Sequence, residues 1–362
     1  MESLTFDLME QYDYEHLIFC QEKNVGLKAI IAIHNTTLGP AAGGTRMWTY
    51  ATEVDAMKDA MRLARGMTYK WAAADVNLGG GKCVVIGDPK REKTEQLLRA
   101  LGRAIQRLNG LFLTGPDVGT NLHDMEIMCR ESRYVVAVSE SLGGPGDTSS
   151  ETAFGVIQGM RACLNAVYGG SDLQGRTVAV QGVGAVGGDV VAQLVKAGAI
   201  VTITDVDSEK VAQIATAYGM KTVPPEEIYS LPVDVYCPCA LGAVLNDITI
   251  PVLRCKIICG SANNQLAEDR HGEMIAQREI VYAPDYIVNA GGALTNIDSL
   301  APGGFNRQRA HATVARIYQN MEQLLEISRE QGIPTHRAAD VLAEQRLARG
   351  RIEQSMDKDS ER

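Results

Sequence analysis

The spacing of apolar residues predicts alternating strands and helices in the first 145 residues. Short apolar runs at 27–33, 110–115 and 134–139 are typical of buried strands. From Thr52 onward apolar residues recur at steps of three and four, which predicts a helix with Thr52 as its N-cap. A second helix is predicted at 93–108. The apolar stripe of the first helix comprises Val54, Met57, Met61, Ala64, Met67 and Trp71.

Three consecutive glycines, 79–81, interrupt this pattern. We expect them to break regular structure, and we expect a short buried strand, KCVVIGD, to begin at Lys82. Because glycine has no side chain, the triplet would also leave room for a ligand beside Lys82.

After residue 145 the pattern becomes a regular alternation of strand and helix. A Gly/Ser/Pro-rich segment at 141–151 marks the predicted domain boundary. Strands alternating with helices of ten or more residues indicate a parallel, doubly wound sheet, so the fold class is α/β with two domains. Strands are predicted at 176–181, 200–205, 234–239, 256–260 and 280–288, and helices at 152–167, 185–197, 208–218 and beyond 305.

Composition excludes several classes of partner. The net charge of −9 and the lack of a basic run argue against nucleic acid or an anionic membrane surface. No stretch approaches 18 apolar residues, and the acidic N-terminus lacks the basic start of a secretion signal, so we expect a cytoplasmic protein. The eight cysteines and six histidines lack metal-site spacing, which predicts reduced thiols and no metal.

A glycine-rich loop in the second domain points to a dinucleotide. Gly182-x-Gly184-x-x-Gly187 follows a predicted strand and opens a predicted helix, and Asp205 ends the next strand 18 residues later. Glycines let the backbone approach a pyrophosphate, and the helix N-terminus supplies hydrogen-bond donors to it. An acid at 205 with no arginine beside it would repel a 2′-phosphate, so NAD is favoured over NADP. The loop also contains Ala185 and Val186.

Two lysines, Lys70 and Lys82, occupy positions that the hydrophobic pattern predicts to be buried. Lys70 lies on the border of the apolar stripe, where a lysine whose stem covers apolar surface is the plain alternative. A lysine desolvated beside another cation shifts toward neutrality and can act as a base. One ammonium could hold a substrate carboxylate while the other exchanges protons with Asp117, at the end of a predicted strand.

Several long motifs resemble the Glu/Leu/Phe/Val dehydrogenase family of amino-acid dehydrogenases, and most closely its leucine dehydrogenase branch. The resemblance covers nearly the whole chain. It implies reversible NAD-dependent oxidative deamination of an L-amino acid, with residues 1–145 and about 333–362 forming the substrate domain and 146–332 the Rossmann-type NAD domain. The family is also oligomeric, so we expect a homo-oligomer. The motifs include TTLGPAAGGTRMW, RLARGMTYK, NLGGGK, TGPDVGTN, GGPGDTSSETAFGV, GVGAVG, PCALGAVLND, GSANNQL and YAPDYIVNAGG.

The resemblance also assigns roles to individual residues. Lys70 would bind the substrate α-carboxylate, Lys82 would activate water against the imine, and Asp117 would carry protons to and from the amino group. Asn263 would lie near the substrate and Thr152 near the nicotinamide amide. The floor of the pocket would be lined by Gly43 and Gly44.

Four positions that match the family's side-chain pocket bear on specificity. A lysine stands at the first of them in glutamate-specific relatives, so Ala42 argues against glutamate. The small residues resemble those of phenylalanine dehydrogenases, although overall similarity favours leucine. Asn296 departs from both patterns, and it would either turn away or bind a polar atom of a larger aromatic or polar substrate. The four positions are Ala42, Gly115, Ala293 and Asn296.

Two other functions compete with this one. A 2-hydroxy acid dehydrogenase would need a His/Arg pair in place of two lysines, and none stands out. A catalytically inactive NAD-binding regulatory subunit would typically have lost one of Lys70, Lys82 and Asp117, and all three are present.

Overall fold

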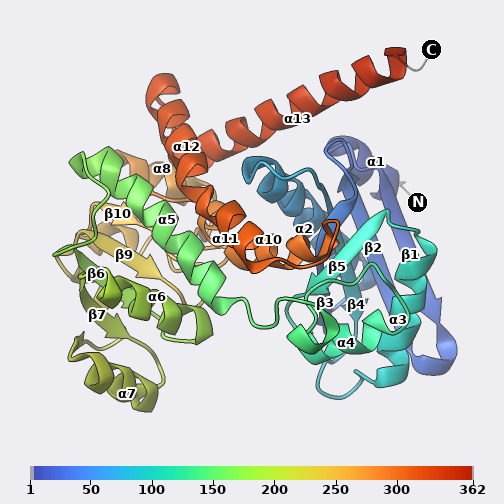
Figure 1. Cartoon of the computed structure of the whole chain (residues 1–362), viewed down its shortest axis with the longest axis horizontal. Coiled ribbons are helices and arrows are strands. Elements are labelled where there is room, and N and C mark those ends of the chain that lie inside the picture. The colour runs from blue at the N-terminus through green and yellow to red at the C-terminus, as the bar shows by residue number, and fades with distance from the viewer. Residues whose placement is uncertain (1–3, 361–362) are drawn as a thin grey trace. The chain divides into compact units, whose positions relative to one another are not determined.

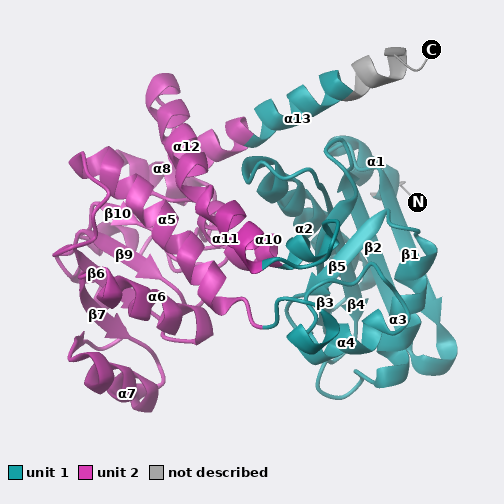
Figure 2. Cartoon of the chain, in the orientation of Figure 1, with its two compact units in different colours: residues 1–146, 296–306, 343–362 teal, residues 147–295, 307–342 magenta. Residues whose placement is uncertain are grey.

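A computed structural model describes the backbone of residues 4–360 and the side chains of 5–353 (Figure 1). The chain forms two compact units (Figure 2). Unit 1 comprises residues 1–146, 296–306 and 343–362, and unit 2 comprises 147–295 and 307–342. Unit 1 therefore includes 296–306, which was predicted to belong to the second domain, and the chain returns to unit 1 at 343, whereas the predicted return was at about 333.

Unit 1 is built on a mixed five-stranded sheet in the order β1-β2-β4-β3-β5. β1 and β2 pair antiparallel, as do β2 and β4, whereas β3 lies parallel to both β4 and β5. The strands are β1 (His16–Glu22), β2 (Leu27–Asn35), β3 (Ala41–Trp48), β4 (Gly79–Ile86) and β5 (Phe112–Pro116). The helices are α1 (Leu4–Gln11), α2 (Glu53–Ala73), α3 (Glu95–Arg107) and α4 (Leu122–Cys129).

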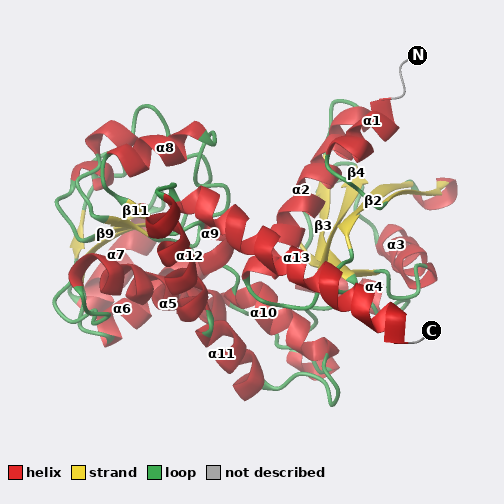
Figure 3. Cartoon of the chain, turned by 90° about the horizontal axis from the view of Figure 1, so that it is seen from above, coloured by secondary structure: helices red, strands yellow, loops and turns green. Residues whose placement is uncertain are grey.

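The two faces of this sheet carry separate hydrophobic cores. Figure 3 shows α2 on one side of the strands and α3 and α4 on the other. One core joins α2 to alternate residues of β2 and β4, among them Ile30 and Val84, and the other joins α3 and α4 to Ile31 and Cys83. Because neighbouring residues of a strand point to opposite faces, this alternation fixes which side chains share the face of α2.

The predicted start of α2 is confirmed, and one member of its stripe is wrong. The Thr52 hydroxyl accepts the backbone N–H of Asp55 at 3.1 Å, as an N-cap does. Val54 is 39% exposed, whereas Met57, Met61, Ala64 and Trp71 are buried.

Besides β1, which was not predicted, unit 1 departs from the strand predictions in three places. Residues 79–81 do not interrupt regular structure, because they form the first half of β4. β3, in the glycine- and alanine-rich segment, was not predicted as a strand. The run 134–139 makes only one isolated bridge, from Val135 to Thr114, and Ala137 has a left-handed φ of 63°, which ends the extended conformation.

Unit 2 contains the predicted parallel, doubly wound sheet, which confirms the α/β fold class. Its six strands lie in the order β11-β10-β9-β6-β7-β8, and every pair is parallel. The order reverses direction between β6 and β9, so their carboxyl ends form the switch point at which such sheets bind ligands. The strands are β6 (Thr177–Gln181), β7 (Ile200–Thr204), β8 (Lys221–Thr222), β9 (Val235–Pro238), β10 (Ile257–Ile258) and β11 (Val281–Tyr282).

Helices α5 to α13 complete the chain. The strand predicted at 280–288 is too long, because Pro284 precedes the short helix α9, and proline commonly marks a helix start. No helix in the part of the chain that the structure describes is long and apolar enough to span a membrane. The helices are α5 (Ser149–Tyr168), α6 (Ala185–Lys196), α7 (Ser208–Tyr218), α8 (Arg270–Gln277), α9 (Asp285–Val288), α10 (Gly291–Ile297), α11 (Arg307–Ala315), α12 (Ile317–Gln331) and α13 (Thr335–Ser360).

Candidate active site

Lys82 and Asp117 form a buried ion pair in unit 1. The Lys82 ammonium lies 3.1 Å from Oδ2 of Asp117, and Lys82 is only 4% exposed. Lys82 belongs to β4, and Asp117 directly follows β5. Both side chains lie on the α2 face of the sheet. Lys82 is two residues before Val84 on β4, and Asp117 is two residues after Gly115 on β5, and residues two apart along a strand share a face. The prediction that these two groups meet is thus confirmed by the geometry.

The environment shifts the pKa of both groups downward. Burial lowers the pKa of the Lys82 ammonium below its ordinary value, although the Asp117 carboxylate opposes this shift. Burial alone would raise the pKa of Asp117, but the charges of Lys82 and Arg46 together hold it below its ordinary value. An amine whose proton is held less tightly, next to a carboxylate that stays ionised, is suited to proton transfer.

Arg46 extends this pair into a network. Its Nε donates to Oδ2 of Asp117 at 2.7 Å, and its Nη1 donates to Asp59 at 2.9 Å. Asp59 on α2 also accepts from the hydroxyl of Tyr50 at 2.7 Å and from Arg62 at 2.8 Å. Such charge-assisted bonds hold the Asp117 carboxylate in one orientation beside Lys82.

Arg46 and Asp59 were not predicted as site residues from the sequence. Arg46 lies two residues after Gly44, so the two-residue period of a strand places it on the face of Lys82. That signal could be read only after β3 had been recognised as a strand.

Gly44 makes the approach of the pair possible. A Cβ at this position would stand 2.8 Å from the Cβ of Asp117 and 3.2 Å from the Lys82 nitrogen. The neighbouring Gly43 is required by the sheet itself, because a Cβ there would lie 1.8 Å from the carbonyl oxygen of Gly81. Both glycines therefore serve close packing around the ion pair.

The glycine triplet before Lys82 is filled by the protein itself. A Cβ on Gly80 would lie 2.0 Å from the Thr68 hydroxyl, and one on Gly81 would lie 2.8 Å from the ring of Phe112. The expectation that the triplet leaves space for a ligand is therefore wrong. Its physical role is to let α2 approach β4 closely.

This close approach brings the C-terminal part of α2 next to the strands. Thr68 lies against Gly80, and Met67 lies 3.2 Å from the Cβ position of Gly43. Lys70 follows these two residues within one helical turn of α2. Lys70 is half-buried and stands on the element that covers the Lys82 face of the sheet.

Two of the predicted pocket positions share this face. These positions are Ala42 and Gly115. Ala42 lies two residues before Gly44 on β3 and so shares its face, and Gly115 on β5 is the register partner of Gly44. Ala42 is buried, and its carbonyl oxygen accepts the indole N–H of Trp71 at 2.9 Å. A Cβ at Gly115 would make only ordinary contacts, the nearest at 3.5 Å to Val136. The face beside Lys82 is thus lined by small residues.

The glycine loop of unit 2 has the geometry of a phosphate-binding turn. Gly182 directly follows β6 and has a φ of 95°, and Gly184 is the N-cap of α6, which begins with Ala185 and Val186. A Cβ on Gly187 would stand 2.1 Å from the carbonyl oxygen of Gly182, so that glycine closes the turn. A Cβ on Gly184 would meet no described atom within 4 Å, which leaves its backbone accessible to a ligand.

Asp205 is fixed at this loop by the backbone. Its carboxylate accepts the N–H of Val183 at 2.7 Å and of Asp207 at 3.0 Å. Burial would raise the pKa of Asp205, but these bonds lower it below its ordinary value, so it stays ionised. The glycine loop and Asp205 therefore fit a dinucleotide whose adenosine ribose carries free hydroxyl groups.

The remaining predicted residues lie around α5 and α10. Thr152 is in the first turn of α5, and a Cβ on Gly292 would lie 2.6 Å from its hydroxyl. Oδ1 of Asn263 accepts the side-chain amide of Asn289 at 2.7 Å, which orients Asn263 and was not foreseen. Ala293 and Asn296 lie on α10, the former in unit 2 and the latter at the start of the unit 1 segment 296–306.

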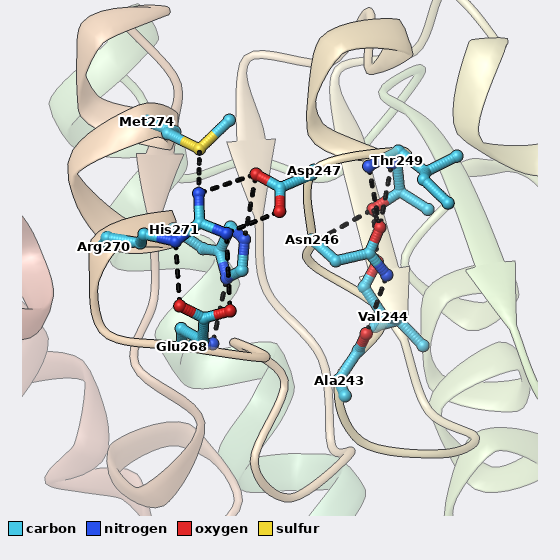
Figure 4. A network of polar contacts seen from close by, with 10 residues as sticks. Ala243, Val244, Asn246, Asp247, Thr249, Glu268, Arg270, His271 and Met274 are labelled. Atoms are coloured by element: carbon cyan, nitrogen blue, oxygen red, sulfur yellow. Dashed lines mark hydrogen bonds and ion pairs between the residues drawn. The ribbon is translucent and has the colours of Figure 1, made fainter.

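A separate polar cluster in unit 2 contains none of the predicted residues (Figure 4). Arg270 donates to both oxygens of Asp247, at 2.7 and 2.5 Å, and to Glu268 at 2.8 Å. The buried ring of His271 accepts the N–H of Glu268 at 2.9 Å. The cluster ties the segment after β9 to the start of α8 and is structural.

Comparisons with known proteins agree with this arrangement. Residues 15–134 match the model of the Glu/Leu/Phe/Val dehydrogenase dimerisation domain, and 202–354 match that of the glutamate/leucine/phenylalanine/valine dehydrogenases. Leucine dehydrogenase of Bacillus subtilis is 52% identical over 97% of this chain and 96% of its own. Phenylalanine dehydrogenase of Thermoactinomyces intermedius is 47% identical over 94% and 93%.

Solved structures show the same fold. The L-tryptophan dehydrogenase of Nostoc punctiforme superimposes with a TM-score of 0.87 at 41% identity, over 96% of this chain and 99% of that one. A hetero-hexameric glutamate dehydrogenase of Thermus thermophilus, at 22% identity, has a TM-score of 0.72 and shares the fold. The resemblance drawn from the sequence is therefore confirmed: the chain belongs to the Glu/Leu/Phe/Val dehydrogenase family of amino-acid dehydrogenases.

Proposed function

We propose that the protein catalyses the reversible NAD-dependent oxidative deamination of a hydrophobic L-amino acid, either branched-chain or phenylalanine. The observation that carries the proposal is the buried Lys82–Asp117 pair. The named relatives support it, because enzymes acting on leucine and phenylalanine are about half identical to this chain over nearly its whole length.

In this reaction the amino acid, NAD and water give a 2-oxo acid, ammonia, NADH and a proton. NAD, when bound, accepts the hydride from the α-carbon. Lys70 would hold the α-carboxylate by its ammonium. Asp117 would take a proton from the substrate amino group and later return one to the leaving ammonia. Lys82, in its neutral form, would take the proton of the water that attacks the imine carbon.

The hydrogen bonds around Asp117 support these separate roles of Asp117 and Lys82 in proton transfer. Arg46 keeps Asp117 ionised and oriented, and the burial of Lys82 makes its neutral form accessible. A catalytic pair must be held within a fraction of an ångström of its working geometry, and a bond at 2.7 Å from Arg46 contributes to that.

The cofactor would bind at the glycine loop. Gly182, Gly184 and Gly187 would admit the pyrophosphate to the N-terminus of α6, and the ionised Asp205 would accept the ribose hydroxyls. The carboxylate would repel a 2′-phosphate, which favours NAD over NADP. Thr152 and Asn263 would contact the nicotinamide end and the substrate.

Two further properties are proposed with the same reaction. The first matching family model is described as a dimerisation domain, which supports a homo-oligomer. The net charge of −9 favours an enzyme that binds neither nucleic acid nor an anionic membrane surface, and a cytoplasmic location is proposed with it.

Incubation of the purified protein with NAD or NADP and a panel of L-amino acids tests the proposal. We expect NADH absorbance with leucine, valine or an aromatic amino acid, and little with glutamate or with NADP. If NAD binds but no amino acid is turned over, the protein is an inactive NAD-binding subunit and the proposal fails.

A further inference from the structure

Two buried polar groups stand without partners at the end of α10. Oδ1 of Asn296 and the hydroxyl of Ser299 are shielded from solvent, and neither has a hydrogen-bond partner among the described residues. Buried polar atoms are nearly always paired, because leaving them unpaired costs free energy. Two such atoms three residues apart indicate groups kept for a ligand.

The helix presents these groups on the side of Gly292, whose Cβ position lies 2.6 Å from the Thr152 hydroxyl on α5. Gly291 lies against the backbone of Glu151 on α5, and Thr295 bonds back to the Gly291 carbonyl at 2.8 Å. Asn296 lies one helical turn after Gly292 and therefore on the same side of the helix. Ser299 follows one turn later in the 3₁₀ segment Asp298–Leu300, so the two unpaired groups continue along one side.

Both residues belong to the compact unit that holds the lysine–aspartate pair. The segment 296–306 is part of unit 1, together with Ala42 and Gly115 on the Lys82 face of the sheet. Those positions carry small side chains, and a Cβ at Gly115 would meet nothing closer than 3.5 Å. Small residues at these positions are what a bulky substrate side chain would require.

We propose that Asn296 and Ser299 select an aromatic L-amino acid whose ring carries an N–H or O–H donor. This inference rests on the proposed deamination reaction and extends its substrate class beyond the branched-chain amino acids and phenylalanine. An amide oxygen only accepts hydrogen bonds, so it requires a donor from the ligand, and the hydroxyl of Ser299 can both accept and donate. An indole N–H or a phenol O–H satisfies Asn296, whereas the side chains of leucine, valine and phenylalanine leave it unpaired.

Substrate pairs of equal shape test the inference. The donors are L-tryptophan and L-tyrosine, and their donor-free partners are β-(3-benzothienyl)-L-alanine and L-phenylalanine. We expect kcat/KM of the wild-type enzyme to favour the donor by about tenfold or more in at least one pair, because sites built for a hydrogen bond discriminate strongly. The favoured pair identifies whether indole or phenol is the group recognised.

The variants Asn296→Leu and Ser299→Ala sharpen the test. Asn296→Leu keeps the branching of the side chain and lacks the acceptor, so the ratio of kcat/KM between donor and donor-free substrate should fall toward one. Ser299→Ala should reduce the ratio by a smaller factor.

Wild-type ratios near one in both pairs, with ready turnover of leucine or phenylalanine, would overturn this inference and leave the proposed function intact. That comparison needs no variant, so it holds even if a substitution impairs folding. Absence of turnover with every amino acid would overturn the proposed function itself, and the inference with it.

Discussion

The two units hold their candidate sites by different physical means. In unit 1 the site consists of charged side chains, and burial together with the balance among Lys82, Asp117 and Arg46 sets their protonation. In unit 2 the loop from Gly182 to Gly187 offers backbone groups at a helix N-terminus, and Asp205 is held by backbone N–H groups. The first site should therefore respond to small displacements of charge, and the second to the addition of a single methyl group.

The largest effect is expected where a methyl group would disturb the charges. Gly44→Ala places a Cβ 2.8 Å from the Cβ of Asp117, so it must displace the pair. We expect kcat/KM to fall by about 100-fold or more. Gly66→Ala is the matched control, because Gly66 lies exposed in α2 with no atom near its Cβ position, and it should keep full activity. A fully active Gly44→Ala enzyme would refute the tight geometry.

Removal of the second lysine should affect binding more than chemistry. Lys70→Ala should raise KM for the amino acid by about 10- to 100-fold, the worth of a charged hydrogen bond, while kcat changes little. Lys58→Ala, an exposed lysine on the same helix, serves as the control. An unchanged KM in Lys70→Ala would remove the carboxylate from this residue.

In unit 2 a methyl group should weaken cofactor binding and spare the fold. Gly184 has a φ of −61° and open space at its Cβ position, so Gly184→Ala is compatible with folding and would block a pyrophosphate. We expect Kd for NAD to rise roughly tenfold, about 1.4 kcal/mol, with Tm unchanged. Gly188→Ala, whose nearest neighbour is 3.8 Å away, should bind NAD normally. Equal affinities in both variants would place the pyrophosphate elsewhere.

A smaller effect should appear in the pH dependence of stability. Burial lowers the pKa of His34 to about 4, and its ring bonds Thr68 beside Gly80 at 2.8 Å. Because the unfolded chain titrates near 6.5, it binds more protons below that pH, and stability is lost as pH falls from 6.5 toward 4. Between pH 7 and 5.5 the free energy of unfolding should drop by about 1 kcal/mol more in the wild type than in His34→Gln. Equal slopes in a urea titration would contradict this.

The same contrast explains which parts of the molecule could be predicted from the sequence. The glycine loop, the caps of α2 and the helices of unit 2 are specified by residues close together in the chain, such as Thr52 with Asp55. Their geometry is local, so spacing alone predicts them.

The site of unit 1 depends on contacts that are distant in sequence. β3 and the glycine half of β4 lack the alternation of apolar and polar side chains that predicts a strand, and Thr68 and Phe112 occupy the space beside Gly80 and Gly81. Because β3 was not predicted as a strand, the position of Arg46 opposite Asp117 could not be predicted either. The run at 134–139 had the apolar character of a strand, but it pairs only through Val135. Apolar character alone therefore could not tell a paired strand from a buried loop.

The central claim is that Lys82 exchanges protons as an amine whose pKa is set by burial and by Asp117. The most direct test is the pH dependence of kcat/KM for deamination in the wild type and in Asp117→Asn. We predict an apparent pKa below the ordinary 10.5 of lysine, shifted still lower in the variant, because the carboxylate that raises the pKa of Lys82 is gone. The amine of the substrate titrates identically with both enzymes, so only the shift is informative. An apparent pKa that does not move would contradict the account.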